Sequence, residues 1–489
     1  MDKIRVENLK FTDEKGRTRL FNGMNIDDKL IDRDSFRYNL DDEFFKKFRM
    51  YGLDFIRLAV TWQNLEPRAG EYNESYLKSI DGIFERAAKH GVYILLDLHQ
   101  DLYSGFDGVG GGDGAPGWAC MSDGLKMRNP RVVWVEGYLL CGCTRRCFDH
   151  FWANDITHGM GLQDRFALLW QMLARRYGSS PALFGFDLLN EPFPGTPGKK
   201  MIFRLAKSAA KNIAFNGKLD RKRIIKSAFK KDVRGLLDSI DGSIVPDIMS
   251  KLDSLQAEFD IKVYSPFLNR ITKAIREVTP DGIIMMEQSF LCNGGARHFV
   301  PPVTVDGKRE EQQCFGPHSY DIAVDTPLYK YANAGRVKAF FNEMRSTQLR
   351  LNVPVVVGEW GGCSDNKDTS WFGHGRELLN YFDENRWSQS YWDYHGDDMD
   401  APLMDLLSRT HPVAVGGEIG SYGYDYETDV FTLEFISDGK NETLIYAHKP
   451  FKAPGGFKYK TVEAYENGAR VIAIKPGAGE CAVTLNFKN

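Results

Sequence analysis

Two glutamates stand directly after apolar runs, where a side chain can do acid–base or nucleophilic chemistry. Glu191 ends the run Phe186–Pro192 (FDLLNEP), and the proline after it prevents a strand from continuing. Glu359 ends the apolar part of Val355–Gly361 (VVVGEWG). Cleavage of a glycosidic bond needs two such carboxyl groups, because one protonates the leaving oxygen and the other attacks the anomeric carbon. A lone glutamate at a strand end is more often structural, and we predict that role, or a supporting one, for Glu287.

The chain that must position these glutamates alternates between strand-like and helical stretches over its first 400 residues. This alternation predicts an α/β protein with a (β/α)8 TIM barrel rather than an open doubly wound sheet. No G-x-G-x-x-G sequence stands at a strand-to-helix turn, which also argues against the open sheet. The eight predicted strands are Leu20–Asn25, Gly52–Val60, Gly91–His99, Phe184–Leu189, Gly282–Met286, Phe315–Tyr320, Val353–Gly358 and Ser388–Tyr394.

The last part of the chain has a different pattern. Short alternating runs such as Phe431–Phe435 and Arg470–Ile474 are separated by Asp-Gly, Pro-Gly-Gly and Asn-Gly turns, without a helical period. We therefore predict a catalytic barrel over residues 1–402 and a C-terminal antiparallel β-sandwich domain over residues 403–489.

Two connections within the barrel are too long for ordinary loops. They span about residues 100–161 and 195–262. Both follow the carboxyl ends of predicted barrel strands, where such barrels keep their active sites. Insertions at that end usually shape substrate binding, with stabilising decoration as the alternative.

Composition excludes several classes of protein. The 489 residues include 63 Lys and Arg against 66 Asp and Glu, a net charge of −3, so we expect no nucleic-acid partner. No run of about 18 apolar residues occurs, which argues against a transmembrane helix. The first residues (MDKIRVE) contain no hydrophobic stretch, so we predict no signal peptide in this chain. Both a cytoplasmic protein and a secreted one whose signal has been removed remain open.

Eight cysteines are too few for a disulfide scaffold in a chain of this length. Cys141, Cys143 and Cys147 stand near His150, but the spacing C-x-C-x3-C matches no common zinc pattern. We predict free, partly buried thiols, and neither a metal nor a cofactor.

The sequences Asn-Glu-Pro and Gly-Glu-Trp around the two glutamates resemble glycoside hydrolase family 5 over about residues 12–400. Further residues stand in the order of that family: Arg57 closes the second strand, His99 closes the third, His318 and Tyr320 lie on the sixth and Trp392 lies on the eighth. Narrower features resemble its endoglycoceramidase group: Gly23-Met24-Asn25 with Lys29, His99–Ser104 (HQDLYS), Gly112–Pro116 (GDGAP) with Trp118, and Thr410–Gly417 (THPVAVGG). The resemblance implies a retaining endo-β-glycosidase that separates oligosaccharide from ceramide in glycosphingolipids.

The same resemblance implies roles for the two glutamates. Glu359 is the expected nucleophile and Glu191 the expected acid/base, with their carboxyl groups about 5–5.5 Å apart. Arg57 and Tyr320 are expected to donate hydrogen bonds to Glu359. The charge of Glu359 is expected to hold up the pKa of Glu191 until the glycosyl-enzyme forms.

The remaining residues are expected to support the acid/base or to contact the sugar. His318 is expected beside Glu191, Asn190 on the sugar 2-OH, His99 on another hydroxyl and Trp392 under the apolar face of the ring. By analogy with endoglycoceramidases, Lys29 and Asp101 contact the glycan; a surface lysine and a loop-capping aspartate are the alternatives. Trp62, Trp118 and Trp360 either line sugar subsites or belong to the core.

One segment departs from the balanced charge of the chain. Lys199–Arg234 contains 13 Lys and Arg against two Asp, a charge of +11 in 36 residues. Ile202, Leu205, Ala206, Ala209 and Ile213 recur in it at helical spacing, and Phe203 and Phe229 add apolar bulk. A basic amphipathic helix is typical of membrane-surface binding, which would bring the enzyme to a glycolipid. A solvated helical hairpin is the alternative.

Two other functions are compatible with the sequence. One is an exo-acting β-glucosidase or β-galactosidase on monohexosyl lipids or aryl glycosides, which a pocket closed after one sugar would favour. The other, a non-catalytic glycan-binding protein, is disfavoured because both carboxylates and all their companions are present.

Overall fold

The computed structural model describes residues 1–30, 33–105, 112–128, 134–215, 220–230, 232, 234–235, 242, 244–324, 326–363, 365–454 and 456–488. Its centre is a sheet of eight parallel strands: β4 (Asn22–Asp27), β5 (Phe55–Thr61), β6 (Tyr93–His99), β9 (Leu183–Asp187), β10 (Ile283–Glu287), β13 (Gln313–Gly316), β14 (Val356–Val357) and β15 (Ser388–Tyr391). Bridges from Phe315 to Val355 and from His318 to Glu359 join the two edge strands, β13 and β14. The predicted barrel is therefore confirmed.

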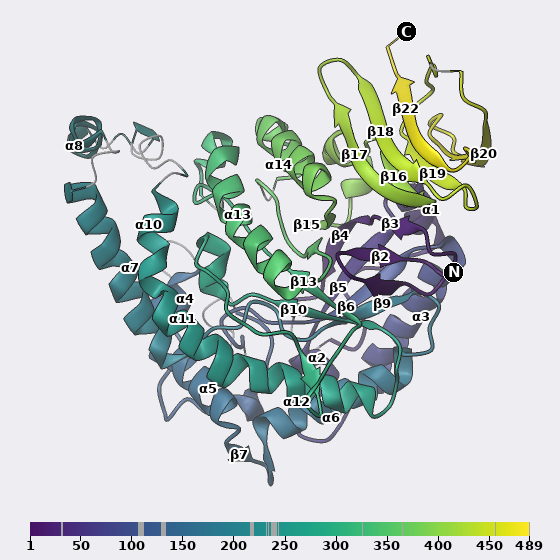
Figure 1. The fold of residues 1–489 in the computed structure, drawn as a ribbon. Coiled ribbons are helices and arrows are strands. Elements are labelled where there is room, and N and C mark those ends of the chain that lie inside the picture. The colour runs from purple at the N-terminus through teal and green to yellow at the C-terminus, as the bar shows by residue number, and fades with distance from the viewer. Residues whose placement is uncertain are drawn as a thin grey trace.

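Helices surround this barrel (Figure 1). They include α1 (Asp42–Met50), α3 (Glu74–His90), α6 (Leu162–Tyr177), α12 (Ser265–Arg276), α13 (Ala334–Leu351) and α14 (Phe372–Asn385). In α3, Asn73 caps the first turn by accepting from Tyr76 N, and Gly91 ends the last turn in the left-handed conformation. Its buried residues recur at helical spacing, so one face of α3 packs on the barrel.

The N-terminal end of the barrel is closed by aromatic rings. Phe21, Phe55 and Phe184 contact one another there, and Phe11 adds a fourth ring against Phe184 at 5.2 Å. Phe11 belongs to the short strands that precede the barrel: β1 (Arg5–Glu7), β2 (Lys10–Thr12) and β3 (Thr18–Arg19). Edge-to-face packing of this kind buries a large apolar area at this end of the barrel. The site must therefore lie at the other end.

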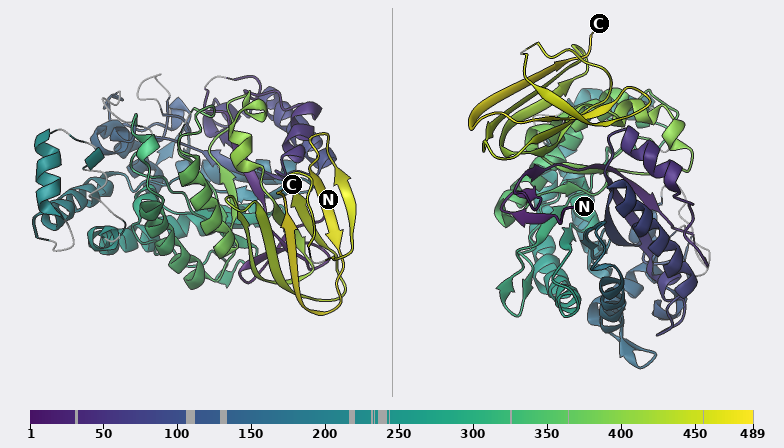
Figure 2. Two further views of the ribbon diagram at one scale, coloured as in Figure 1. Left: turned by 90° about the horizontal axis from the view of Figure 1, so that it is seen from above. Right: turned by 90° about the vertical axis from the view of Figure 1, so that its right-hand side faces the viewer.

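The C-terminal domain consists of two antiparallel sheets beside the barrel (Figure 2). One contains β17 (Gly417–Asp425), β18 (Val430–Ser437) and β22 (Gly479–Asn486), and the other β16 (His411–Val415), β19 (Thr443–Ala447), β21 (Arg470–Ile474) and β20 (Tyr459–Ala464). The second sheet continues through β3, β2 and β1, because β16 pairs with β3. Sequence patterns assigned residues 1–402 to the barrel, whereas strands within residues 5–19 extend this sheet.

The two long connections contain structure of their own. After β6 come η1 (Gly117–Ala119), α4 (Glu136–Leu140), α5 (Gly142–Ala153), β7 (Ile156–Thr157) and β8 (Met160–Gly161). After β9 come α7 (Thr196–Phe215), α8 (Arg221–Lys230), α10 (Val245–Met249), η2 (Ser250–Leu252), α11 (Asp253–Phe259) and η3 (Asp260–Tyr264). Shorter elements are α2 (Trp62–Leu65), β11 (Thr304–Val305), β12 (Lys308–Arg309), η4 (Phe290–Gly294), η5 (Tyr329–Tyr331), η6 (Asp398–Asp400) and α15 (Leu403–Leu407).

Helices α7 and α8 project from the body of the protein (Figure 1). Two residues of the apolar face predicted for Lys199–Arg234, Ile202 and Leu205, pack against the core, whereas Ala206 of the same face is exposed. Phe203 and Phe229 remain 71% and 86% exposed. Residues 216–219, 231 and 233 of this segment lie outside the described residues. Within the described ranges, none of the helices is long and apolar enough to cross a membrane.

Candidate active site

The centre of the site is Arg57, whose side chain is fully buried. The sequence predicted that Arg57 closes the second strand, whereas it is the third residue of β5 (Phe55–Thr61), which continues for four more residues. Its guanidinium donates hydrogen bonds to groups from four other barrel strands and the segments after them: Asn25 Oδ1 (3.0 Å), Asp187 Oδ2 (2.7 Å), Asn190 Oδ1 (2.9 Å), Glu287 Oε1 (2.6 Å) and Glu359 Oε1 (2.9 Å). Asp97 lies 3.1 Å from Nη2. A planar group with five donors can satisfy such a ring of acceptors, which a lysine could not.

Glu359 is held at both carboxylate oxygens. Oε1 accepts from Arg57, and Oε2 accepts from the hydroxyl of Tyr320 at 2.9 Å. The sequence prediction that these two residues contact Glu359 therefore describes the geometry correctly. Two donors on opposite oxygens fix the plane of the carboxylate.

Glu191 lies opposite Glu359. Its backbone is left-handed, with φ +41°, and its N–H donates to Oε2 of Glu287 at 2.7 Å. One carboxylate oxygen of Glu191 and one of Glu359 lie within 4.8 Å of each other. Burial raises the pKa of Glu191 to about 7; hydrogen bonding to His318 opposes this rise and the charge of Glu359 adds to it. The charge of Glu359 thus contributes in the expected direction, and burial is the larger cause of the raised pKa.

His318 lies between the acidic groups. Its Nδ1 is 3.1 Å from Glu191 Oε1 and 3.6 Å from Glu359 Oε1, and its Nε2 is 3.3 Å from Glu287 Oε1. Burial alone would lower the pKa of His318, but the charges of Glu287 and Glu359 raise it well above its ordinary value. The opposite effect occurs at Glu287: burial would raise its pKa, and His318 and Arg57 lower it to about 2. Glu287 is thus a buried carboxylate that supports other residues.

Asn190 and His99 line the next part of the site. Asn190 Nδ2 donates to the carbonyl of Gln100 at 3.1 Å and lies 3.4 Å from His99 Nε2. The other ring nitrogen of His99 is 2.8 Å from Asp97 Oδ2. Trp392 stacks on His99 with ring centroids 5.2 Å apart.

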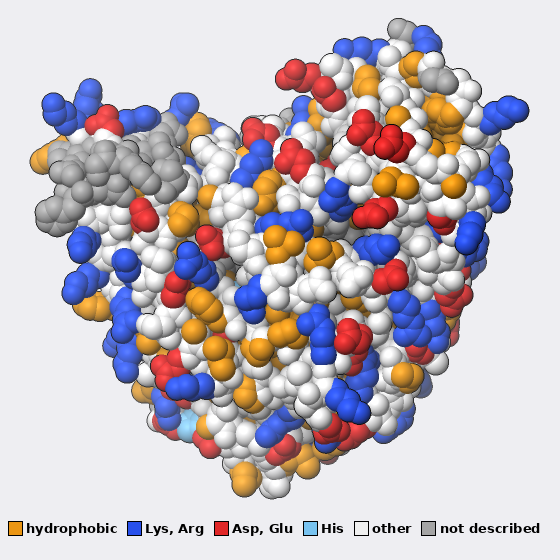
Figure 3. Space-filling model, in the orientation of Figure 1, with side chains coloured by type: hydrophobic (Ala, Val, Ile, Leu, Met, Phe, Trp, Pro, Cys, Tyr) orange, Lys and Arg blue, Asp and Glu red, His pale blue; other side chains and the backbone are white. Residues whose placement is uncertain are grey.

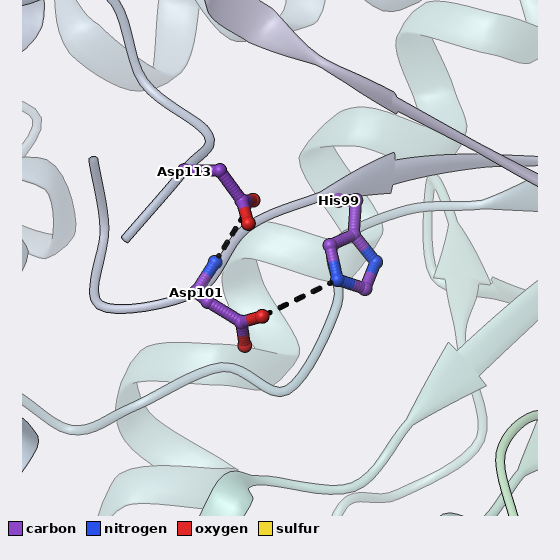
Figure 4. A group of neighbouring side chains, drawn as sticks. All are labelled: His99, Asp101 and Asp113. Carbon is purple, nitrogen blue, oxygen red and sulfur yellow. Dashed lines mark hydrogen bonds and ion pairs between the residues drawn. The ribbon is translucent and has the colours of Figure 1, made fainter. Parts of the chain in front are cut away.

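Lys29 and Asp101 form a polar group beside Trp392. Lys29 Nζ is 2.5 Å from Asp101 Oδ2, and it lies 4.4 Å from the centre of the Trp392 ring. Asp101 Oδ2 is also 3.7 Å from His99 Nε2, and its N–H donates to Asp113 Oδ1 at 3.2 Å (Figure 4). The two residues predicted by analogy therefore lie beside the predicted sugar platform.

The three tryptophans for which the sequence left a subsite or a core role open, Trp62, Trp118 and Trp360, have different surroundings. Trp360 is fully buried and donates to Gln389 Oε1 at 2.6 Å, so it belongs to the core. Trp62 and Trp118 pack edge to face with centroids 5.2 Å apart. Trp62 lines an apolar cavity of about 20 Å³ together with His99, a space too small for a sugar.

Three groups of acidic and histidine side chains have the spacing of metal ligands: His99 with Asp101 and Asp113, Asp97 with Asp187 and Glu287, and the trio Glu191, His318 and Glu359. In the first two, a protein cation already forms ion pairs with the carboxylates, Lys29 and Arg57 respectively. All eight cysteines are unpaired, as predicted, and Cys141, Cys143 and Cys147 are buried. His150 contacts the carboxylates of Asp155 and Asp123 instead.

Four residues of the site were missed by sequence reasoning. Asp97 and Asp187 are acidic residues inside otherwise apolar strands, a signal that could have identified them as partners of a buried cation. Asn25 was noted only as part of a motif. Asn293, whose Nδ2 donates to Glu191 Oε1 at 2.5 Å, lies in a segment without a sequence signal.

A closed eight-stranded barrel with paired glutamates after its fourth and seventh strands is the architecture of a barrel glycosidase. The family described as Cellulase (glycosyl hydrolase family 5) matches residues 13–225 and 260–398. The Glycoside hydrolase family 5 C-terminal domain matches residues 409–478. The chain therefore belongs to glycosyl hydrolase family 5.

Two named relatives align with nearly the whole chain. An endoglycoceramidase of Hydra vulgaris is 24% identical over 94% of this chain and 82% of its own length. Endoglycoceramidase I of Rhodococcus hoagii (strain 103S) is 23% identical over 99% and 88%. Among solved structures, endo-glycoceramidase II from Rhodococcus sp. aligns over 99% of this chain and 100% of its own, with a TM-score of 0.73 and 21% identity. This last likeness shows a shared fold.

Proposed function

We propose that this enzyme is a retaining endo-β-glycosidase that hydrolyses the bond between oligosaccharide and ceramide in glycosphingolipids. The observation that carries the chemistry is the pair Glu191 and Glu359, with carboxylate oxygens within 4.8 Å of each other. Retaining enzymes keep their carboxyl groups about 5–5.5 Å apart, whereas inverting enzymes leave about 6.5–9.5 Å for a water. The two endoglycoceramidases that match most of the chain support the substrate class.

In the first step Glu359 attacks the anomeric carbon. Its plane is fixed by Arg57 and Tyr320, so one oxygen can approach the carbon without reorganisation. Glu191 donates its proton to the glycosidic oxygen as that bond breaks, and ceramide leaves as its alcohol. A pKa of about 7 keeps a large fraction of Glu191 protonated near neutral pH.

In the second step Glu191 acts as a base. The negative charge of Glu359 is lost when the glycosyl-enzyme forms, which removes one cause of the raised pKa of Glu191. Glu191 then accepts a proton from water while the water oxygen attacks the anomeric carbon and displaces Glu359. Asn190 holds the sugar 2-OH, a contact that strengthens in the transition state. His99, Trp392, Lys29 and Asp101 form the remaining glycan surface.

The test is mass spectrometry of the products from lactosylceramide in detergent, with Glu359→Gln as the control for contaminating activity. Lactose and ceramide, absent with the variant, are the expected products. Galactose and glucosylceramide would contradict endo action.

The second candidate is an exo-acting β-glucosidase on monohexosyl lipids. A glucosylceramidase of Rhizopus delemar favours it, with 24% identity over 60% of this chain and 51% of its own length. The same experiment separates the two. Cleavage of glucosylceramide or an aryl glucoside without cleavage of lactosylceramide would support the exo enzyme.

We further propose that α7 and α8 bind the surface of an anionic membrane. The sequences of α7 and α8 contain five Lys and Arg each and no Asp or Glu. Figure 3 shows Lys and Arg side chains along the edge where Figure 1 places the two helices. Exposed Phe203 and Phe229 can enter the interface, and each basic residue contributes about 1 kcal/mol near anionic lipid. We do not expect a nucleic-acid partner.

The membrane proposal is tested with vesicles of phosphatidylcholine with and without phosphatidylserine. Combined Lys222→Gln, Lys226→Gln and Lys230→Gln should weaken sedimentation with the anionic vesicles and leave cleavage of detergent-dispersed substrate unchanged. The matched control changes three exposed lysines of the C-terminal domain, Lys440, Lys458 and Lys475, to Gln. Equal binding by the two triple variants would contradict a specific role for α8.

A further inference from the structure

The two carboxylate oxygens of Glu191 have unequal surroundings. Oε1 accepts a hydrogen bond from Asn293 Nδ2 at 2.5 Å and lies 3.1 Å from His318 Nδ1. Among the residues that the structure describes, none donates a hydrogen bond to Oε2. Glu191 is therefore held by one oxygen while the other is free to react.

The orientation of the Asn293 amide follows from its neighbours. Gln288 Nε2 donates to the backbone carbonyl of His318 at 2.8 Å, and a carbonyl can only accept. The same Nε2 lies 2.8 Å from Asn293 Oδ1, so Asn293 must present its oxygen to Gln288 and its NH₂ group to Glu191. The backbone of Asn293 is fixed as well, because its carbonyl accepts from Ser319 Oγ at 2.9 Å.

We propose that Asn293 is a positioning residue, which anchors Oε1 of Glu191 so that Oε2 alone exchanges the proton with the glycosidic oxygen and then with water. This inference rests on the proposed function. In the first step the proton moves from Oε2 to the glycosidic oxygen as the bond from that oxygen to the anomeric carbon breaks and Glu359 bonds to that carbon. In the second step a proton moves from water to Oε2 as the water oxygen bonds to the anomeric carbon and the bond from that carbon to Glu359 breaks.

Asn293 is the neutral member of the group around Glu191. The charged groups that face Glu191 are His318 after β13, Glu359 after β14, Glu287 on β10 and Asp101 after β6. A donor to a carboxylate stabilises its charged form, so removal of Asn293 should raise the pKa of Glu191. This effect distinguishes a positioning role from general loss of structure.

The test uses Asn293→Ala with two lactosides in detergent: lactosylceramide, whose alcohol leaving group needs a proton, and 2,4-dinitrophenyl β-lactoside, whose leaving group does not. We expect kcat/KM for lactosylceramide to fall about 10- to 100-fold and that for the aryl lactoside to fall less than about threefold. The basic limb of kcat/KM against pH for lactosylceramide should move upward. Asn293→Asp, which preserves size and adds a negative charge, should move this limb further.

The matched control is Asn269→Ala. Asn269 is also partly buried, and its Oδ1 accepts from Thr304 N at 2.8 Å, away from the site. Asn269→Ala should leave the ratio of kcat/KM for the two lactosides and the pH profile unchanged. If Asn293→Ala lowers both rates equally with no change in the pH profile, Asn293 has only a structural role. If the unaltered enzyme cleaves neither lactoside, the proposed function itself fails.

Discussion

At the scale of residues, the site gives two glutamates opposite properties through their contacts. Glu359 receives hydrogen bonds on both oxygens, from Arg57 and Tyr320, and its position is therefore fixed. Glu191 is bonded at one oxygen, and its pKa is raised to about 7, first of all by burial. This difference supports the proposed roles, Glu359 as nucleophile and Glu191 as acid/base.

Substitution of each glutamate should have a distinct kinetic signature. Glu359→Gln should lower kcat on every glycoside by at least about 10³-fold, because no glycosyl-enzyme can form. Glu191→Ala should slow lactosylceramide cleavage by about 10²- to 10⁴-fold. It should spare formation of the glycosyl-enzyme from 2,4-dinitrophenyl β-lactoside, seen as a burst of phenolate. Azide should then accelerate turnover by the Glu191→Ala variant and not by the Glu359→Gln variant. Acceleration of the Glu359→Gln variant instead would reverse the assignment of acid/base and nucleophile.

The pH dependence follows from the protonation state of Glu191. The first step needs its protonated form, so kcat/KM for lactosylceramide should fall as the pH rises through about 7. The charge of Glu359 contributes to the raised pKa, so Glu359→Gln should lower the pKa of Glu191. Titration of the ¹³C-labelled carboxyl group by NMR measures this change directly. An unchanged or higher value in the variant would contradict the coupling.

At the scale of elements, Arg57 joins strands that are far apart in the sequence. From β5 it bonds Asp187 on β9, Glu287 on β10 and Glu359 after β14. Parallel strands in a barrel end at one rim, so their terminal side chains converge there. The buried carboxylates would repel one another without this cation, and the same residue therefore supports both fold and site.

Arg57→Ala should lower the free energy of unfolding by about 3–5 kcal/mol, because buried carboxylates lose their partner. In the folded variant these carboxylates would have higher pKa values than in the unfolded chain. The loss in free energy of unfolding should therefore become smaller as the pH falls and the carboxylates become protonated. Urea unfolding at several pH values measures both effects. The control Arg68→Ala removes an exposed pair with Glu71 and should cost less than about 0.5 kcal/mol. A deficit independent of pH would exclude the electrostatic explanation.

At the scale of the whole molecule, the C-terminal domain is joined to the barrel by backbone and side-chain contacts. Strand β16 pairs with β3, and Arg19 Nε donates to the carbonyl of Val413 at 2.9 Å. Tyr446 of β19 is buried and its hydroxyl donates to the carbonyl of Met50 at 2.7 Å. Both connections support the domain as a fixed part of the barrel.

Alanine substitutions at two glycines can test how tightly the C-terminal domain packs on the barrel. Gly52 and Gly16 both have φ of +76°, so alanine costs about 1–2 kcal/mol in backbone strain at either position. A Cβ at Gly52 would lie 2.5 Å from the Tyr446 ring, whereas nothing lies within 4 Å of one at Gly16. Gly52→Ala should therefore lower the free energy of unfolding by about 1–3 kcal/mol more than Gly16→Ala. Equal losses in thermal or urea unfolding would show that Tyr446 packs loosely.

Much of the fold and the site was predictable from the sequence because the signals are local. Periodicity identified the barrel strands, and strand ends identified Glu191 and Glu359. The pairing of β1–β3 with β16 was not predictable, because nothing in the first 19 residues indicates which of two adjacent sheets they join. The apolar residues of α7 were recognised, but periodicity cannot distinguish a face that packs on protein from one that faces lipid.

The sequence by itself determined which residue types are available, and it placed the paired glutamates and their companions at strand ends. Only the tertiary structure decided that Asp97, Asp187 and Glu287 surround Arg57, and that Asn293 contacts Glu191. The physical reason is distance along the chain: Asn293 is 102 residues from its partner, and no local pattern records such a contact. The pKa of Glu191 depends mainly on burial, which likewise exists only after the chain has folded.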